Sequence, residues 1–417
     1  MGKFKINGGK RLYGEVEVHG AKNSILPILA ATILNEGISV IHNVPRLKDV
    51  EAMIEILEHI GCKVSFKGKD IVVDAKDVKD SEIPDHLMRT MRSSIFLLGA
   101  LIARNKRAFI SFPGGCDIGH RPIDLHLKGL KRLGVKIDES YGYIKCEGKK
   151  IKGSEIHLDL PSVGATENLM MASVLAEGIT IIRNAAKEPE IEDLQNFLNA
   201  MGAKIKGAGT NTIVIEGVKK LNDVEYSIIP DRIVAGTYLC AAAMTRGEIT
   251  VVRALKDHLE PLISKLKEMG CILKTGNDYV KINCDKRPKA VDMIVTQPYP
   301  GFPTDLQPQI VSALSIAEGT SIVTETIFDN RFKYTEELVR MGADIKVEGR
   351  VAVVKGVEKL MGAKVVAKDL RGGAALIIAG LGAEGTTVVE GAEHIDRGYE
   401  NIEKALRGLG ADIVRIM

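Results

Sequence analysis

Hydrophobic and polar residues follow one pattern along this chain, and the pattern recurs six times. A helix-like apolar stripe ends in leucine, three further residues and glycine, and short alternations of apolar and polar residues come next. The six glycines are 68 to 73 residues apart and are Gly61, Gly134, Gly202, Gly270, Gly342 and Gly410. A glycine here predicts a helix that ends in a left-handed residue. The two alternating runs after most copies predict a hairpin.

A second pattern, interleaved with the first, predicts a buried helix that leads into a strand. Residues 29–32 read Leu-Ala-Ala-Thr, and 36–41 read Glu-Gly-Ile-Ser-Val-Ile; residues 172–182 repeat the arrangement, while the copy ending at 104–107 lacks the glycine. Because these helices are apolar nearly all round, we expect sheet to pack against them. The sequence therefore predicts an α/β protein of six units, and a length of 417 residues favours two or three domains.

A polar residue stands at an equivalent point before or at the start of each buried helix. The six positions are Lys22, Arg92, Ser162, Asp231, Asp305 and Arg371. If pseudo-symmetry relates the units, six helix N-termini face one space, each with unpaired N–H groups and about half a positive charge. Such a space would bind anions. The alternative is that the period is only architecture and carries no chemistry.

The charge balance excludes several classes of partner. The formal net charge is only +3, so no global basic field indicates nucleic acid or an anionic membrane. The N-terminus lacks the apolar core of a signal peptide, and no run of about 18 apolar residues is present. We therefore expect a cytoplasmic protein with neither a nucleic-acid nor a membrane partner.

Five of the six cysteines are predicted to fill the core. There is no CxxC pair and no Cys/His group with the spacing of zinc ligands, so neither a metal site nor a disulfide framework is expected. Cys240 lies in an apolar run, and the others are in or beside strand-like segments. The five predicted core residues are Cys62, Cys146, Cys240, Cys271 and Cys284.

The sixth cysteine, Cys116, lies in the polar, glycine-rich segment 111–122 and is a candidate catalytic residue. Proline and glycine in this segment predict a loop, where a thiol can reach a substrate. His120 and Arg121 would lower the pKa of Cys116 toward neutrality, where a side chain both gives and takes protons, whereas Asp117 would raise it. The alternative is an ordinary free cysteine in a surface turn.

Five segments distributed over essentially the full length resemble one family. They are Gly20–Asn23, Pro113–Cys116, Pro303–Asp305, Glu325–Phe332 and His394–Glu400. The chain resembles the UDP-N-acetylglucosamine 1-carboxyvinyltransferases, the MurA branch of the enolpyruvyl transferases. The resemblance implies two domains, each an inside-out α/β barrel of three repeats, with helices in the middle and sheets outside. It places one domain at 22–229, the other at 1–21 plus 230–417, and the active site in the cleft between them.

The same resemblance implies a reaction. The enolpyruvyl group of phosphoenolpyruvate is transferred to the 3′-hydroxyl of UDP-N-acetylglucosamine with release of phosphate, the first committed step of peptidoglycan synthesis and hence of cell wall biogenesis. It also implies that the protein is a target of fosfomycin, an epoxide that mimics phosphoenolpyruvate. Such a reaction needs no metal or redox cofactor, and the sequence has no Walker A or Rossmann motif; we expect no cofactor.

The resemblance also assigns roles to individual residues. Cys116 matches the general acid and Asp305 the candidate base, although a carboxylate at a helix start is often only a cap; Lys22 and Arg397 complete the catalytic set. The positions that match phosphoenolpyruvate-binding residues are Lys22, Asn23, Arg121, Arg371 and Arg397. Those that match nucleotide-sugar-binding residues are Asn23, Arg92, Arg121, Pro122, Ile123, Asp124, Leu125, Ser162, Val163, Gly164, Asp305 and Ile327. Leu160 departs from the family, because some members have lysine there.

Two rival functions remain. The first is that of 3-phosphoshikimate 1-carboxyvinyltransferase, an enzyme with a similar fold. At the helix start where this chain has Lys22-Asn23, that enzyme has Lys-Ser. The second is a non-catalytic paralogue that only binds a nucleotide sugar. Since every matched catalytic position is filled, the sequence favours an enzyme. The oligomeric state does not follow from the sequence.

Overall fold

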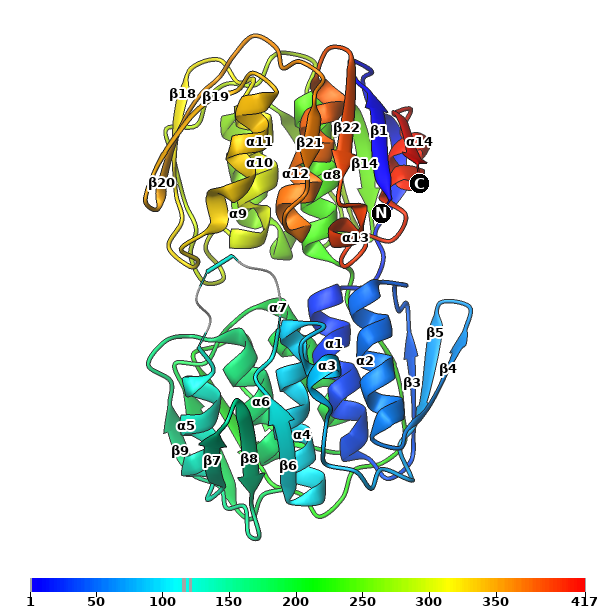
Figure 1. Cartoon of the computed structure of the whole chain (residues 1–417), viewed down its shortest axis with the longest axis vertical. Coiled ribbons are helices and arrows are strands. Elements are labelled where there is room, and N and C mark those ends of the chain that lie inside the picture. Colours follow the sequence, from blue (N-terminus) through cyan, green and yellow to red (C-terminus); the bar gives the residue numbers. More distant parts are fainter. Residues whose placement is uncertain (1, 115–117, 120–121, 417) are drawn as a thin grey trace. The chain divides into compact units, whose positions relative to one another are not determined.

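A computed structural model describes residues 2–114, 118–119 and 122–416 (Figure 1). The described residues divide into two compact units. The insert unit comprises residues 20–114 and 122–229, and the terminal unit comprises residues 2–19, 118–119 and 230–416. In this part of the chain no helix has the length and apolar character needed to cross a membrane.

The insert unit has helices in its centre and sheets around them. Its central helices α1 (Lys22–Ala31), α4 (Phe96–Asn105) and α6 (Val163–Ser173) pack against one another. Its described residues form three sheets, with the strand orders β13-β3-β5-β4, β6-β8-β7 and β11-β12-β10-β9. The remaining helical segments are η1 (Thr32–Leu34), α2 (Lys48–His59), α3 (Asp85–Met88), η2 (Arg92–Ile95), α5 (Asp124–Arg132) and α7 (Pro189–Ala200). The strands are β3 (Ile38–His42), β4 (Lys63–Lys67), β5 (Asp70–Asp74), β6 (Arg107–Ser111), β7 (Lys136–Ser140), β8 (Tyr143–Glu147), β9 (Glu155–His157), β10 (Ile179–Arg183), β11 (Lys204–Lys206), β12 (Thr212–Glu216) and β13 (Val224–Ser227).

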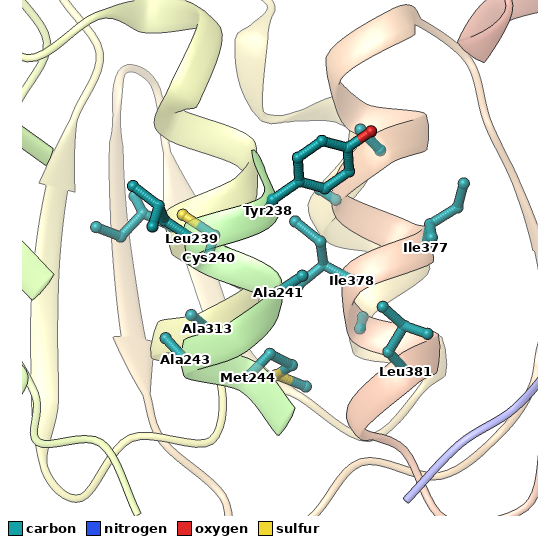
Figure 2. Close-up of a cluster of buried hydrophobic side chains, with 14 of the residues drawn as sticks. Tyr238, Leu239, Cys240, Ala241, Ala243, Met244, Ala313, Ile377, Ile378 and Leu381 are labelled. Carbon is teal, nitrogen blue, oxygen red and sulfur yellow. The ribbon is translucent and has the colours of Figure 1, made fainter. Parts of the chain in front are cut away.

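The terminal unit repeats this plan around α8 (Arg232–Thr245), α10 (Gln307–Leu314) and α12 (Leu370–Gly382). Figure 2 shows side chains of the three helices together in its core. Its sheets have the orders β21-β22-β1-β23, β15-β16-β14-β2 and β17-β18-β20-β19. The other helical segments are η3 (Lys256–His258), α9 (Glu260–Glu268), η4 (Thr304–Leu306), η5 (Arg331–Tyr334), α11 (Thr335–Arg340), α13 (Ala392–Ile395) and α14 (Ile402–Gly408). The strands are β1 (Lys3–Asn7), β2 (Tyr13–Glu17), β14 (Glu248–Val252), β15 (Ile272–Thr275), β16 (Tyr279–Asn283), β17 (Met293–Val295), β18 (Thr320–Thr324), β19 (Asp344–Glu348), β20 (Val351–Lys355), β21 (Lys364–Val366), β22 (Thr386–Glu390) and β23 (Asp412–Ile416).

The sixfold repeat and the inside-out α/β arrangement are confirmed. All six repeat glycines have positive φ, from 87° to 110°, immediately after an outer helix. The first five are followed by the predicted hairpins, β4-β5, β7-β8, β11-β12, β15-β16 and β19-β20. The sixth is followed by β23 alone, which pairs antiparallel with β1. The first strand of the chain therefore supplies the hairpin partner that the last repeat lacks.

Two of the cysteines differ from the prediction. Cys62, Cys146 and Cys240 are free and buried, as expected, but Cys271 and Cys284 form a disulfide, with their Cα atoms 4.7 Å apart. Hairpin register is the reason. Ile272 is paired with Asn283. The next residues along the two strands, Cys271 and Cys284, therefore lie opposite each other at a distance that a disulfide spans.

Reduction of this disulfide is expected to destabilise the protein by about 3 kcal/mol, because the bond closes a short loop in the unfolded chain. Urea unfolding with and without a thiol reductant measures the effect. The double variant Cys271→Ala/Cys284→Ala is the control, since its unfolding midpoint is expected to be the same in both conditions. A wild-type midpoint unaffected by reductant would contradict the prediction.

Candidate functional site

The predicted general acid, Cys116, lies outside the described residues, and so does Arg121. The described residues nearest to them in the sequence have defined contacts. Gly114 donates its N–H to the carbonyl of Met88 (3.2 Å) within the insert unit. The carbonyl of Ile118 accepts a hydrogen bond from the N–H of Asn330 (3.1 Å) within the terminal unit.

In the terminal unit, the predicted base Asp305 lies between two buried arginines. It is in the 3-10 turn η4, which precedes α10. Arg371 donates from Nε to Oδ2 of Asp305 (3.1 Å), and Arg331 donates from Nη2 to Oδ1 (2.9 Å). Both arginine side chains are at most 3% exposed, whereas the Asp305 side chain is 28% exposed. The carboxylate is therefore partly accessible, whereas the two positively charged guanidinium groups that bind it are buried.

The sequence analysis did not select Arg331 as a site residue. Besides its bond to Asp305, its guanidinium donates to the carbonyl of Thr304 from Nε (3.2 Å) and from Nη2 (3.1 Å). It also lies 3.9 Å from Oδ1 of Asp369. Arg331 belongs to the segment Glu325–Phe332 that carries the family resemblance, and this was the available signal. These contacts indicate that Arg331 fixes the position of the Asp305 carboxylate.

Arg371 retains hydrogen-bonding capacity for an anion. Burial alone would lower its pKa, but Asp305 and other nearby groups outweigh burial, so the pKa lies above its ordinary value. The guanidinium is therefore charged. Its Nη1 has no hydrogen-bond partner among the described residues, although the atom is buried. A buried, charged donor without a partner is costly unless an anion meets it, and this favours the predicted role in anion binding.

A polar network lies next to Arg371. The guanidinium carbon is 5.5 Å from the centre of the Tyr399 ring, a cation–π distance. The hydroxyl of Tyr399 is 2.8 Å from Oγ1 of Thr237 and accepts a hydrogen bond from Nε2 of Gln309 (3.2 Å). These three residues come from α8, α10 and the segment after α13. The network thus fixes the ring against which Arg371 rests.

The prediction of unpaired N–H groups at all six helix starts is wrong at three of them. The Ser162 side chain accepts from the N–H of Ala165 (3.3 Å) at α6. The side chains of Asp231 and Asp369 each accept from two N–H groups, at α8 and α12. Short polar side chains before a helix are themselves N-caps, so the polar residues that marked these positions consume part of the donor capacity. Fewer backbone N–H groups are therefore open to an anion at these helix starts than was predicted.

In the insert unit, the predicted residue Lys22 begins α1 and is buried against a carboxylate. Its Nζ lies 2.7 Å from Oδ2 of Asp49, in the first turn of α2. Asn23 follows it and is half-buried. Ser24 donates to the carboxylate of Asp193, which also accepts from Tyr226 (2.6 Å). The start of α1 is therefore held by two acidic residues.

Three segments of the insert unit that carry predicted nucleotide-sugar residues lie close to His126. They are Arg92 in η2, 122–125 before and at the start of α5, and 162–164 at the start of α6. A Cβ at Gly164 would lie 3.2 Å from Cε1 of His126, so a larger residue would require the ring to shift by a few tenths of an ångström. Nδ1 of His126 is 2.9 Å from the Asn168 side chain. Pro122 and Asp124 are exposed, Ile123 is buried, and Leu160 is 68% exposed.

His126 gives the insert unit a predicted sensitivity to acid. Burial, with a smaller contribution from Arg92, lowers the pKa of His126 to about 3, so the stability from its neutral form is present above about pH 6.5 and is lost as the pH falls. Between pH 7 and pH 5 the wild type should lose about 2 kcal/mol more than His126→Gln. Urea unfolding at both pH values measures this. His157→Gln, at an exposed histidine, should behave like the wild type; an equal loss in His126→Gln would refute the prediction.

The remaining predicted residues lie in the terminal unit. Ile327 is half-buried, and its N–H donates to Oε1 of Glu325 (2.8 Å). Arg397 is half-buried and follows α13. The terminal unit thus brings Asp305, Arg371 and the Ile327 segment together, and the insert unit brings Arg92, 122–125 and 162–164 together. Among the described residues no group of His, Cys, Asp or Glu side chains has the arrangement of a metal site.

The chain matches one protein family and several known proteins over nearly its full length. Residues 6–406 match the family of EPSP synthase (3-phosphoshikimate 1-carboxyvinyltransferase). The chain is 87% identical to UDP-N-acetylglucosamine 1-carboxyvinyltransferase 2 of Caldanaerobacter subterraneus subsp. tengcongensis, with both chains covered completely. It is 54% identical to UDP-N-acetylglucosamine 1-carboxyvinyltransferase 1 of Carboxydothermus hydrogenoformans, covering 100% of this chain and 99% of the other.

Two solved structures have the same fold. The enolpyruvyl transferase NikO of Streptomyces tendae matches with a TM-score of 0.89 and 26% identity, over 99% of this chain and 98% of that one. An EPSP synthase of Acinetobacter baumannii matches over the whole of both chains, with a TM-score of 0.79 and 18% identity. The second likeness concerns the fold alone.

Proposed function

The chain belongs to the EPSP synthase family, and we propose that it transfers the enolpyruvyl group of phosphoenolpyruvate to the 3′-hydroxyl of UDP-N-acetylglucosamine, releasing phosphate. The observation that carries the proposal is its full-length similarity to the Caldanaerobacter enzyme, which is named for this reaction. The reaction belongs to peptidoglycan synthesis, so we place the protein in the cytoplasm. Its partners are the two substrates.

The proposed mechanism is addition followed by elimination. Cys116 protonates C3 of phosphoenolpyruvate while Asp305 takes the proton of the attacking hydroxyl, and the new C–O bond forms at C2. Loss of a proton from C3 and departure of phosphate from C2 then restore the double bond. The carboxylate of Asp305 is partly exposed and can meet the attacking hydroxyl, and the two arginines fix its position.

Arginine and lysine hold the anionic substrate in this proposal. Arg371 binds phosphoenolpyruvate with its unpartnered Nη1, and planar guanidinium groups suit phosphate and carboxylate oxygens. Lys22, Arg121 and Arg397 supply the remaining positive charge. The nucleotide sugar is assigned to the residues around His126 together with Asn23, Asp305 and Ile327. Each unit carries only part of the proposed set, so neither alone should be active.

The second candidate is transfer to shikimate 3-phosphate, the reaction for which the matched family is named. Phosphate release from phosphoenolpyruvate, measured with each acceptor in turn, separates the candidates. We expect release with UDP-N-acetylglucosamine and none with shikimate 3-phosphate. The reverse result would support the second candidate, and release with neither acceptor would indicate a non-catalytic paralogue.

A further inference from the structure

Glu325 is a buried carboxylate at the end of β18, and four hydrogen bonds satisfy it. The residue is 0% exposed. Oε1 accepts from the hydroxyl of Thr296 (2.9 Å) and from the N–H groups of Ile327 (2.8 Å) and Phe328 (3.1 Å). Oε2 accepts from the hydroxyl of Thr304 (3.0 Å). Burying a carboxylate is costly unless it is fully bonded, so these donors must be held in place around it.

The donors come from three segments, and two of these segments carry proposed site residues. Thr304 is the first residue of η4, and the next residue is Asp305. Ile327 is itself a proposed nucleotide-sugar contact, and its backbone N–H is bound directly. Thr296 follows β17 and also accepts from the N–H of Thr326 (2.9 Å). One carboxylate thus joins the segment of the proposed base to the segment of a proposed substrate contact.

We propose that Glu325 is a positioning residue that sets the place of Asp305 through Thr304 and the place of Ile327 through its backbone. The inference rests on the proposed function, because it takes the roles of Asp305 and Ile327 from there. Glu325 itself touches neither substrate. Each of its two oxygens holds a different segment. Oε2 holds the segment of the proposed base through Thr304, and we call this contact the catalytic arm. Oε1 holds the segment of the proposed substrate contact through Ile327 and Phe328, and we call these contacts the substrate arm.

The division predicts that the two arms can be damaged separately. Thr304→Val removes the bond to Oε2 and leaves the three bonds to Oε1, so kcat should fall roughly tenfold, whereas KM for UDP-N-acetylglucosamine should rise much less than in Glu325→Ala. Glu325→Ala removes both arms, so kcat should fall and KM for the nucleotide sugar should rise, each about tenfold or more. KM for phosphoenolpyruvate should change little in either variant.

Three further variants separate positioning from a merely structural role. Thr304→Ser restores the hydroxyl and should restore kcat. Glu325→Gln keeps the shape of the side chain, and the hydroxyl of Thr304 can accept a hydrogen bond from its amide. This variant should therefore retain most of the activity that Glu325→Ala loses. Thr245→Val removes a buried hydroxyl from α8 of the same unit, which donates to the carbonyl of Ala241, and should leave kcat and both KM values unchanged.

The assay is steady-state phosphate release, with kcat expressed per folded molecule from each variant's unfolding curve. A smaller folded fraction cannot raise KM for one substrate alone, so a selective rise in the nucleotide-sugar KM of Glu325→Ala supports positioning. The proposal is overturned if Thr304→Val matches Thr245→Val, or if Glu325→Ala changes kcat without changing that KM. Absence of phosphate release by the wild type would instead reject the proposed function.

Discussion

Replacement of Cys116 by alanine is expected to lower turnover about 10²–10⁴-fold and to leave the fold intact, because positioned proton transfer contributes that much to a rate. Phosphoenolpyruvate gains a proton at C3 in the proposed addition, and no other cysteine in the chain is predicted to lie in a polar loop. The measurement is phosphate release at saturating concentrations of both substrates, with circular dichroism to establish folding.

Cys146→Ala is the matched control. Cys146 is a free, fully buried cysteine on β8, so its loss should reduce stability by packing alone and leave turnover unchanged. The opposite pattern, with normal phosphate release in Cys116→Ala, would remove the proposed general acid.

The same assignment predicts which thiol an electrophile modifies. Burial raises the pKa of Cys62 and of Cys146 to about 12, and burial also raises the pKa of Cys240. Reaction requires the thiolate, so these three should be inert in the folded protein. Fosfomycin should therefore add once, at Cys116. Intact-mass and peptide analysis measure this, and an adduct on another cysteine would count against the assignment.

The repeat could be predicted well from local sequence signals, because each signal reflects the conformation of the residue at that same position. The glycine after each outer helix adopts the predicted left-handed conformation, since only a residue without Cβ does so at little cost. In the second pattern, the copy before β6 lacks the glycine, and Lys106 at the end of α4 adopts a φ of 59°. The sequence showed that this copy lacked glycine, but not which residue would take the left-handed conformation.

Features that depend on partners distant in sequence could not be predicted in this way. The Cys271–Cys284 bond depends on a hairpin register that composition does not reveal, and Arg331 reaches Asp305 from 26 residues away. The polar helix starts were found, but whether each side chain caps its own helix or faces a ligand depends on rotamers. Asp369 caps α12, whereas the Arg371 side chain turns to Asp305.

Asp305→Asn is expected to lower turnover by at least about 10²-fold, because the amide cannot accept the proton of the attacking hydroxyl. The variant preserves the shape of the side chain, and its amide oxygen can still accept a hydrogen bond from Arg331 or Arg371. Both substrates should still bind, since Arg371, Lys22 and Arg397 remain. Removal of a negative charge between two guanidinium groups should not weaken the binding of anionic phosphoenolpyruvate.

Stability should also fall, because Arg331 and Arg371 are buried and lose their shared counter-charge. Loss of one partner of a buried ion pair costs about 3–5 kcal/mol, and the partial exposure of Asp305 should reduce this cost. Asp329→Asn is the control, since Asp329 pairs with Arg350 where both side chains are about half exposed; its stability should change by less than about 1 kcal/mol.

Calorimetric titration of Asp305→Asn with UDP-N-acetylglucosamine, followed by phosphoenolpyruvate, separates binding from chemistry. We expect near-normal affinity for the nucleotide sugar together with the loss of phosphate release. If turnover stays within a few-fold of the wild type while stability falls as predicted, Asp305 is only the counter-ion of two arginines. The proton acceptor would then have to be sought elsewhere, whereas the fold and the family assignment would stand.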